Sequence, residues 1–539
     1  MTLSEAQFDY VIVGGGAAGS VLAARLSEDP SCTVCLLEAG PEPSSINFIM
    51  PAGFTRTLND ERYTWGYFTE PSERFGERRV KLIQGKVLGG GTSVNGMIFT
   101  RGQGRDFDGW AQAGNPGWDY ESVLAYFRKV ESTGAGDDAV RGRSGAYSVN
   151  VLDVDMPVVK AFRQAAIGYG IAANADYNGR SQAGIGPAQV SVQSGRRVSA
   201  ASAYLAPARG RRNLTVLAGV TVTGVEFDGM RARSVSCQRG GEVQTIHARA
   251  EIILAAGAIG TPKLLQLSGI GHHELLSRIG VATVRHLPGV GENFHDHYLA
   301  RIAVRCPGAV TFNQRARFPR LPLEVLNWFL GRPSVVAVPP ATLQYFLKTR
   351  PDLEDADVQG IFTPASVTQN AVSRAPDPFP GATCAVWQHR PQSRGFVRAR
   401  SADPLELPAV QPNYLREAVD RDVLVAACRT VRAILDTEPF KAMWDLELAP
   451  GNDVQTDDEW IDYAFANGST VFHPVGTAKM GPASDPLAVV DPTLRVHGVE
   501  GLRVVDASVM PQIASGNTAA ATLMIAEKAS DLIRSGARG

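Results

Sequence analysis

The sequence predicts an α/β protein in which a domain built on a parallel sheet is interwoven with an α+β domain built on an antiparallel sheet. Residues 8–40 show the order strand, glycine turn, helix, strand, which is typical of parallel sheets. Between about residues 306 and 460 prolines cluster and apolar residues alternate in short runs, which favours antiparallel strands. The 539 residues are too many for one core and contain no low-complexity linker, so the domains are expected to share the chain in alternating segments.

The opening strand, residues 8–13, is apolar and β-branched, as a buried parallel strand requires. Gly14, Gly16 and Gly19 follow with the spacing G-x-G-x-x-G. The first glycine makes the turn, the second lets backbone approach a pyrophosphate, and the third lets the helix pack closely on the sheet. The helix from about Ala17 to Ser27 directs its positive end at that phosphate. A Rossmann-like, dinucleotide-binding domain is therefore favoured over a bare structural turn.

A second strand from Thr33 to Leu37 ends at Glu38. A carboxylate at this position accepts hydrogen bonds from a ribose diol and repels a 2′-phosphate, so NADP is disfavoured. This stretch alone does not decide between NAD and FAD.

Further elements are recognised by apolar periodicity between glycines and prolines. They are helices over 119–131, 156–170 and 196–205, strands over 213–227 and 251–256, and a helix that begins near Thr261–Pro262. Proline suits the first turn of a helix, because its missing N–H would have no partner there. In the last segment an apolar strand ends at Asp506 and a helix runs from Thr518 to about Ile533.

Composition excludes several classes of partner. The formal net charge is −1, so there is no electrostatic case for nucleic acid or for an anionic membrane. The first ten residues lack the basic and apolar regions of a secretory signal. The longest uncharged run near the end, 507–526, is interrupted by Pro511, Gly516 and Asn517, so we do not expect it to span a membrane.

The six cysteines are scattered along the chain. Cys32 and Cys35 form a C-x-x-C, but it crosses the start of a predicted strand and has no second pair elsewhere. Packed thiols are favoured over a zinc site or a redox dithiol. A reducing, cytoplasmic location is expected.

Three further stretches bring together residue types that suit a binding site. In Gln84–Gly102 glycines surround Asn95, as in a loop whose backbone approaches a flat or anionic group, or in a plain glycine loop. Residues 287–297 end in a His-Asp-His triplet, which is also compatible with a metal site. His473 precedes Pro474, so by itself it equally suits a structural role at a turn.

Taken in order, six segments resemble the glucose–methanol–choline (GMC) oxidoreductase family, flavoenzymes that bind FAD and oxidise alcohols. The resemblance covers essentially the whole chain. The overall sequence pattern is most similar to the choline dehydrogenase and bacterial alcohol dehydrogenase branch of the family. The segments are FDYVIVGGGAAGSVLAARLSE at 8–28, GKVLGGGTSVNGMIFTRG at 85–102, GAIGTPKLLQLSGIG at 257–271, LPGVGENFHDH at 287–297, HPVGTAKMG at 473–481 and VVDASVMPQIASGNTAAATLMIAEKASDLI at 504–533.

This resemblance implies an FAD-binding Rossmann-like domain interwoven with an α+β substrate-binding domain. We expect residues 1–155, 195–305 and 464–539 in the first and residues 156–194 and 306–463 in the second. The residues that match FAD-contacting positions of the family are Gly14, Gly16, Ala17, Ala18, Gly19, Glu38, Ala39, Lys86, Leu88, Gly90, Asn95, Gly96, Met97, Val222, Ala256, Asp506, Ala507 and Thr518.

His473 matches the family's catalytic base, and Asn517 matches a second polar position that is His or Asn in different members. A neutral histidine within hydrogen-bond reach can take the hydroxyl proton of an alcohol, while the carbon-bound hydride passes to flavin N5. Asn517 would donate an amide N–H to the same oxygen, although asparagine also suits a helix N-cap.

The chain departs from some members of the family at two places. Val94 stands where some members attach FAD through a histidine, so non-covalent FAD is expected. The family's usual Asn-Ala-Pro after the second polar residue is Ala519-Ala520-Ala521 here.

The substrate is expected to be a small-molecule alcohol. The segment Ser334–Phe346, which we expect to line its pocket, has no carboxylate for a trimethylammonium group, so a neutral alcohol is favoured over choline. Phe472 would stack on a flat substrate or simply pack. The resemblance places residues 295–297 near the flavin, so no metal is expected. Oxygen and another electron acceptor both remain open, as does a homodimer.

Two other functions compete with this one. An NAD-dependent Rossmann dehydrogenase is disfavoured by the return of the chain to the nucleotide domain at residues 473–533. A flavoprotein without alcohol chemistry, such as the family's light-driven fatty-acid decarboxylases, is disfavoured by the presence of both His473 and Asn517.

Overall fold

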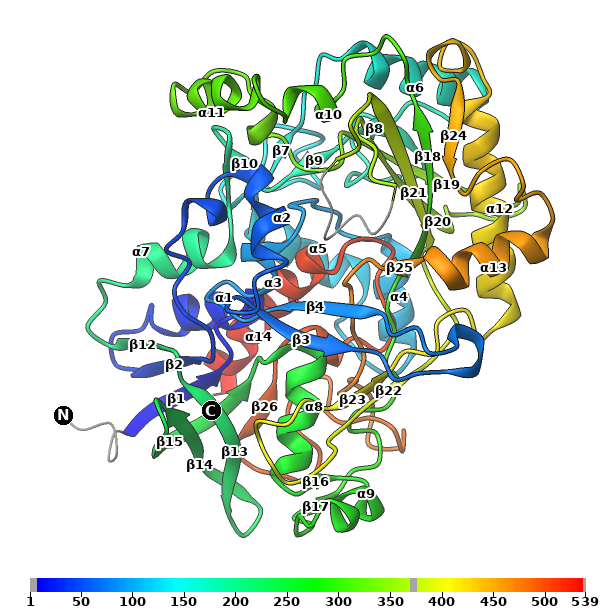
Figure 1. The fold of residues 1–539 in the computed structure, drawn as a ribbon. Coiled ribbons are helices and arrows are strands. Elements are labelled where there is room, and N and C mark those ends of the chain that lie inside the picture. Colours follow the sequence, from blue (N-terminus) through cyan, green and yellow to red (C-terminus); the bar gives the residue numbers. More distant parts are fainter. Residues whose placement is uncertain (1–6, 369–375, 537–539) are drawn as a thin grey trace.

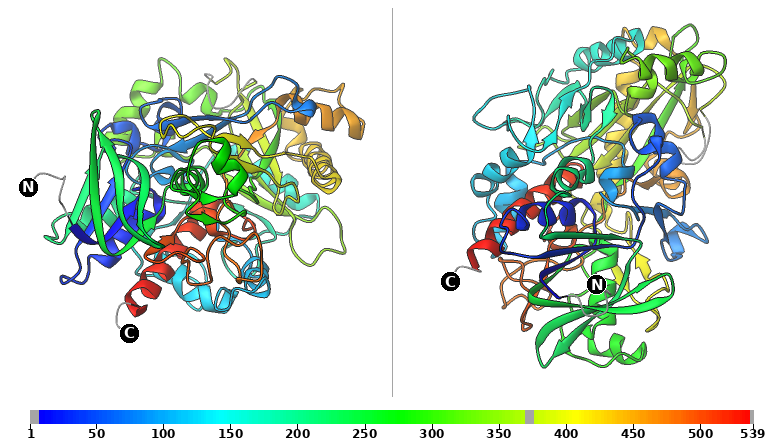
Figure 2. Two further views of the ribbon diagram at one scale, coloured as in Figure 1. Left: turned by 90° about the horizontal axis from the view of Figure 1, so that it is seen from below. Right: turned by 90° about the vertical axis from the view of Figure 1, so that its left-hand side faces the viewer.

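The computed structural model of the chain describes residues 7–368 and 376–536. Two seven-stranded sheets organise the molecule. They lie towards opposite ends of an elongated body, with the C-terminal helix running between them (Figure 1 and Figure 2). Within the described residues, no helix has both the length and the apolar character needed to cross a membrane.

The first sheet is mostly parallel. Its order is β12 (Leu214–Ala218), β2 (Val34–Glu38), β1 (Gln7–Val13), β15 (Glu242–Leu254), β14 (Arg231–Arg239) and β13 (Thr221–Asp228), with β26 (Leu502–Val504) also beside β15. Strands β12, β2, β1, β15 and β26 run parallel, and β14 and β13 continue the sheet as antiparallel strands. The carboxyl ends of four of these strands lead to Gly14, Glu38, Ala256 and Asp506, so these positions meet at one edge of the sheet.

The helices of this domain join distant parts of the sequence. Helix α1 (Ala17–Leu26) packs against α14 (Thr518–Gly536), and α14 also contacts α5 (Tyr120–Val130). The Arg25 guanidinium donates hydrogen bonds of 2.8–3.1 Å to the fully buried carboxylate of Glu527. The beginning and the end of the chain therefore form one layer.

The second sheet is antiparallel. Its order is β24 (Leu446–Ala449), β18 (Tyr298–Arg305), β21 (Gly381–Gln388), β20 (Val358–Thr363), β19 (Leu343–Leu347) and β8 (Gly184–Pro187), with β25 (Ser469–Thr470) also beside β18. One face packs on α6 (Pro157–Gly168) and α12 (Ala418–Leu435) in a shared apolar core, and the other faces the first domain. The predicted boundaries assign β18 and β25 to the first domain, whereas their pairing places them in this sheet; the domain division stays a prediction.

Local differences from the predicted elements have physical causes. Helix α8 (Gly257–Leu267) begins before Thr261, so Pro262 lies inside it and cannot donate to the carbonyl of Ala258. The Thr477 hydroxyl donates to that carbonyl at 2.6 Å instead. The helix predicted over 196–205 is only partly correct: Arg196–Arg197 is strand β11, and the helical turns at Ala201–Leu205 are π-type. The strand predicted over 213–227 is divided into β12 and β13.

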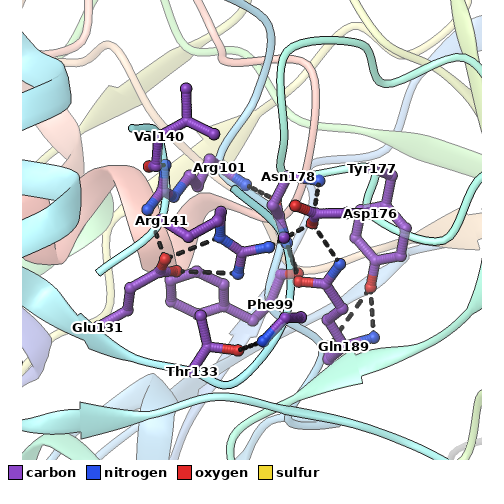
Figure 3. A network of polar contacts seen from close by, with 12 residues as sticks. Phe99, Arg101, Glu131, Thr133, Val140, Arg141, Asp176, Tyr177, Asn178 and Gln189 are labelled. Carbon is purple, nitrogen blue, oxygen red and sulfur yellow. Dashed lines mark hydrogen bonds and ion pairs between the residues drawn. The ribbon is translucent and has the colours of Figure 1, made fainter. Parts of the chain in front are cut away.

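A buried ion-pair network ties the second glycine loop to the rest of the protein (Figure 3). The Glu131 carboxylate accepts hydrogen bonds from Arg101 at 2.6 Å and from Arg141 at 2.8 and 3.1 Å, and all three side chains are buried. Arg141 also pairs with Asp176. Such a cluster is stable only while each charge keeps its partners.

Asn178 connects this network to the backbone on both sides of Thr100. Its side-chain oxygen accepts a hydrogen bond from the Arg101 N–H at 2.7 Å, and its amide donates to the Phe99 carbonyl at 3.0 Å. Thr100 is therefore held at its two neighbours, and its hydroxyl reaches the site described next.

Candidate active site

A large cavity of about 1740 Å³ lies between the carboxyl edge of the first sheet and the open face of the second. Small-ligand pockets usually measure roughly 300–1,000 Å³, so this cavity has room for a dinucleotide and a further small molecule. His473, Asn517 and all the predicted FAD-contacting residues except Gly19 and Leu88 line it. The structure thus brings together residues that are up to about 500 positions apart in the sequence.

Two glycine loops meet at the nucleotide end of the cavity. Gly14 has φ +104°, and a Cβ there would lie 2.4 Å from the Ala255 carbonyl oxygen. A Cβ at Gly90 would lie 2.7 Å from the Cα of Gly16. Because neither loop tolerates a side chain at these points, backbone N–H groups are free to approach a flat or anionic ligand closely.

The two predicted contacts that do not line the cavity have other surroundings. A Cβ at Gly19 would lie 1.9 Å from the Gly14 carbonyl oxygen, so this glycine lets α1 sit directly on the turn. Leu88 is buried, and its Cδ2 would be 2.6 Å from a Cβ at Gly15. Both residues pack against the glycine loops on the side away from the cavity.

Two buried carboxylates are held at the strand ends. Glu38 accepts hydrogen bonds of 2.8 Å from the N–H groups of Gly15 and Gly40, and burial raises its pKa despite these bonds. Asp506 accepts from the Gly257 N–H at 2.8 Å and the Thr261 hydroxyl at 2.6 Å, and burial likewise raises its pKa. Each oxygen of Glu38 keeps a second lone pair for a sugar hydroxyl. Both oxygens of Asp506 already accept two hydrogen bonds, those of Oδ1 coming from the N–H and the hydroxyl of Ser508.

The second glycine loop places Asn95 and Met97 against the cavity. The Asn95 side-chain oxygen accepts from the Met97 N–H at 3.0 Å and from Arg197 at 2.9 Å, which leaves its NH2 group for a ligand. Met97 is fully buried at φ +62°, a backbone region that costs a non-glycine residue free energy and often marks functional loops. Val94 is buried in helix α3 (Gly91–Val94) and offers no nucleophile. The glycine cradle, carboxylates and Asn95 fit FAD.

His473 is buried beside this loop, with a hydrogen-bond partner on each ring nitrogen. Its Nδ1 lies 2.9 Å from Nδ1 of His297, and its Nε2 lies 3.0 Å from the Asn517 side-chain nitrogen. Nε2 of His297 lies 2.8 Å from the carbonyl oxygen of His389. The four groups form one continuous chain from the second sheet to the start of α14.

Only one arrangement of protons satisfies this chain. A carbonyl oxygen only accepts, so Nε2 of His297 carries a hydrogen. Burial lowers the pKa of His297 to about 4, so the ring is neutral and its Nδ1 accepts from Nδ1–H of His473. Burial, and then the nearby His297, hold the pKa of His473 well below its usual value, so Nε2 of His473 bears a lone pair. The Asn517 amide donates to that lone pair.

The backbone of His473 is fixed separately. Its N–H donates to the Asp296 carboxylate at 2.8 Å, and Asp296 also accepts from the hydroxyls of Thr470 and Tyr414. Burial raises the pKa of Asp296 to about 6 against these bonds. Phe472, the preceding residue, has φ +64° and lines the cavity. A strained residue held in place by its surroundings sets the direction of His473.

Asn517 is oriented by two donors to its side-chain oxygen. The Thr100 hydroxyl donates at 3.1 Å and the Gln359 amide at 3.2 Å, so the NH2 group must face His473. Helix α14 begins at the next residue, Thr518, and its first turn, which includes Ala519, also lines the cavity. The positive end of the helix therefore faces the cavity.

Sequence reasoning missed several of these positions. Asp296 and His297 were expected only as part of a loop near the flavin. His389, Thr100 and Gln359 gave no signal of a role, because their roles depend on pairing between distant strands. The described residues contain no group of three or more His, Cys, Asp or Glu arranged to hold a metal ion. All six thiols are free, five of them buried. In the predicted pocket segment, Val335, Val336 and 338–341 line the cavity, whereas 343–346 form β19.

Comparisons with known proteins agree with this geometry. Two family models described as GMC oxidoreductase match residues 8–299 and 391–526. An oxygen-dependent choline dehydrogenase of Staphylococcus aureus is 40% identical over 99% of this chain and 94% of its own length. Pyridoxine 4-oxidase from Mesorbium loti is 30% identical, with TM-score 0.87 over 97% of this chain and 98% of its own. An FAD-dependent oxidoreductase from Chaetomium thermophilum is 26% identical, with TM-score 0.90 over 98% and 100%.

Proposed function

This chain belongs to the GMC oxidoreductase family, and on that premise we propose that His473 and Asn517 activate the hydroxyl group of its substrate. The protein is an FAD-dependent oxidoreductase that acts on the CH–OH group of an alcohol. The single observation that supports the two roles is the lone pair on Nε2 of His473, which the hydrogen-bond chain through His297 points at Asn517 and the cavity.

When bound, FAD supplies the acceptor for the carbon-bound hydride. The protein's own contribution is to handle the proton and to orient the alcohol. Nε2 of His473 takes the hydroxyl hydrogen, and the Asn517 N–H, released from that lone pair, donates to the hydroxyl oxygen. Two contacts on one oxygen fix the direction of the C–H bond.

The positive charge that His473 gains is supported without further proton movement. Its Nδ1–H continues to donate to Nδ1 of His297, whose own proton stays on Nε2 and is donated to the His389 carbonyl. The reaction therefore needs only one proton acceptor, Nε2 of His473. The other groups of the hydrogen-bond chain keep the second proton of His473 on Nδ1.

FAD is held by the two glycine loops, Glu38, Asn95 and Asp506 in this proposal, without a covalent bond. Val94 gives the protein no group for attachment through the second glycine loop. Cytoplasmic location and a homodimer stay predictions. Oxygen and an artificial dye are both offered as electron acceptors in the tests of this proposal.

The deciding experiment is anaerobic mixing of the yellow, purified protein with a panel of alcohols in the dark. Bleaching of the flavin and formation of the matching carbonyl compound are expected. A yellow protein that no alcohol bleaches in the dark, but that reacts with other compounds under light, would overturn alcohol oxidation. Colourless active protein that requires NAD would overturn the cofactor assignment.

A further inference from the structure

Arg301 lies on the cavity side of the antiparallel sheet. Alternate residues of β18 point into the core beneath the sheet, whereas Leu299 and Arg301 line the cavity. Leu299 pairs with Trp387, whose ring centroid is 6.4 Å from that of His473. Arg301 is two residues, or about 7 Å, further along the strand. It therefore borders the substrate side of the cavity, away from the glycine loops.

Within the described part of the chain, the Arg301 guanidinium has no carboxylate partner. In the described ranges 7–368 and 376–536 it forms no ion pair, and the hydrogen bond from Tyr463 goes to its backbone carbonyl. Burial lowers its pKa; the phenols of Tyr463 and Tyr298 oppose this shift, but no carboxylate of the described residues does. A partly buried charge without a partner costs free energy, and a ligand of opposite charge removes that cost.

The neighbouring charges do not satisfy Arg301 either. Arg78 is itself a cation without an acceptor, so it cannot pair with Arg301; it donates to the Tyr298 hydroxyl at 3.2 Å and to the carbonyls of Phe465 and Gly468. The buried carboxylates of the cavity, Glu38 and Asp506, are held at the nucleotide end by backbone and hydroxyl donors.

We infer that the substrate is an alcohol that carries a carboxylate, with its hydroxyl group at His473 and its carboxylate on Arg301. This inference rests on the proposed function and names the substrate class of the same site, in place of the neutral alcohol expected from the sequence. The planar fork of a guanidinium matches one carboxylate with two parallel hydrogen bonds. The same charge repels a trimethylammonium group, so choline is a poor substrate even though a 40% identical relative is a choline dehydrogenase.

The test compares matched alcohols by the rate of flavin reduction without oxygen. The probes are 4-(hydroxymethyl)benzoate, benzyl alcohol and choline, and the variants are Arg301→Gln and Arg301→Lys. Arg305→Gln is the control, because Arg305 lies on the same strand but forms an exposed pair with Asp445. Flavin content and melting temperature of each variant establish that it folds.

For the wild type, we expect the second-order rate constant for the carboxylate to exceed that for benzyl alcohol by at least about tenfold. Arg301→Gln should remove this preference and change the benzyl alcohol rate by less than about threefold, and Arg301→Lys should keep part of it. Arg305→Gln should behave as wild type. Equal rates for the two probes in the wild type, or an unchanged preference in Arg301→Gln, overturns the inference.

A binding measurement separates this inference from the proposed function. Titration with 4-methylbenzoate, which has no hydroxyl group, should show binding to the wild type that Arg301→Gln weakens at least about tenfold. If no alcohol reduces the flavin yet this difference is found, alcohol oxidation fails and the carboxylate site stands. If alcohols are oxidised but 4-methylbenzoate binds both proteins equally, the carboxylate site fails and alcohol oxidation stands.

Discussion

The Nδ1 atoms of His297 and His473 lie 2.9 Å apart, so one imidazole must donate to the other. The His389 carbonyl settles the direction, because it forces the proton of His297 onto Nε2. A backbone oxygen thus determines which nitrogen of His473 carries a lone pair, two residues away along the hydrogen-bond chain.

Replacing His473 by alanine should leave FAD bound and slow anaerobic flavin reduction by about 10²–10⁴-fold, because positioned proton transfer contributes that much. Stopped-flow absorbance measures the rate, and the flavin spectrum measures binding. His273→Ala serves as the control, because His273 belongs to an exposed histidine cluster. A near-normal rate in His473→Ala removes this residue from its proposed role.

Replacing His297 by leucine tests the tautomer argument. Nδ1 of His473 loses its acceptor, so its proton is free to move to Nε2 and block the lone pair. Reduction should slow by between about 10- and 10⁴-fold, as wrong-tautomer variants of catalytic histidines do. Histidine NMR of the wild type should show His473 protonated at Nδ1. Protonation at Nε2 in the wild type would falsify the argument.

The acid side of the pH profile should be flat. The lowered pKa of His473 means that the neutral base persists as pH falls, so the reduction rate should hold from about pH 8 to below about pH 6.5 and decline only at lower pH. Asp296, with a pKa of about 6, titrates nearby. The Asp296→Asn variant shows how much of the pH dependence of the rate comes from this carboxyl group. A half-maximal rate at or above pH 6.5 in both proteins contradicts the assignment.

Thr100→Val removes one donor to the Asn517 oxygen while keeping the size of the side chain. The rate of reduction should fall roughly 2- to 10-fold, the value of one hydrogen bond, with little change in flavin content. Thr133→Val is a matched control, because Thr133 lies near the buried network but makes no contact with Asn517. An unchanged rate in Thr100→Val shows that Gln359 alone orients Asn517.

Denaturation in acid should release all the flavin into the supernatant, because Val94 offers no covalent attachment. Absorbance of the supernatant and of the washed precipitate measures the distribution. Flavin that stays with the polypeptide identifies another attachment residue, which peptide mass spectrometry would locate.

The parallel domain could be predicted from residues 8–40 because its information is local. Apolar runs, glycine spacing and a terminal acid follow one another directly, and β1, α1 and β2 occur where this pattern places them. The resemblance likewise brought His473 and Asn517 together, although their mutual geometry is known only from the fold.

The supporting residues could not be predicted, because their roles come from pairing between strands that are distant in sequence. His389 acts through a backbone carbonyl, which any residue possesses. Thr100 is positioned through Asn178, which lies almost 80 residues further along the chain. Pro262 led to a predicted helix start that is too late. The helix can begin before Pro262 because Thr477, far along the chain, donates to the carbonyl that the proline leaves without a partner.

The contact between α1 and α14 has a consequence for biosynthesis. The cradle for the dinucleotide is encoded near the start of the message, yet Glu527 locks α1 from the opposite end. A ribosome that has translated only the glycine motif, or even β15, carries a nascent chain whose coenzyme pocket still lacks a wall. The complete coenzyme pocket therefore forms only after the last segment has been synthesised, and chains that terminate before it should be colourless.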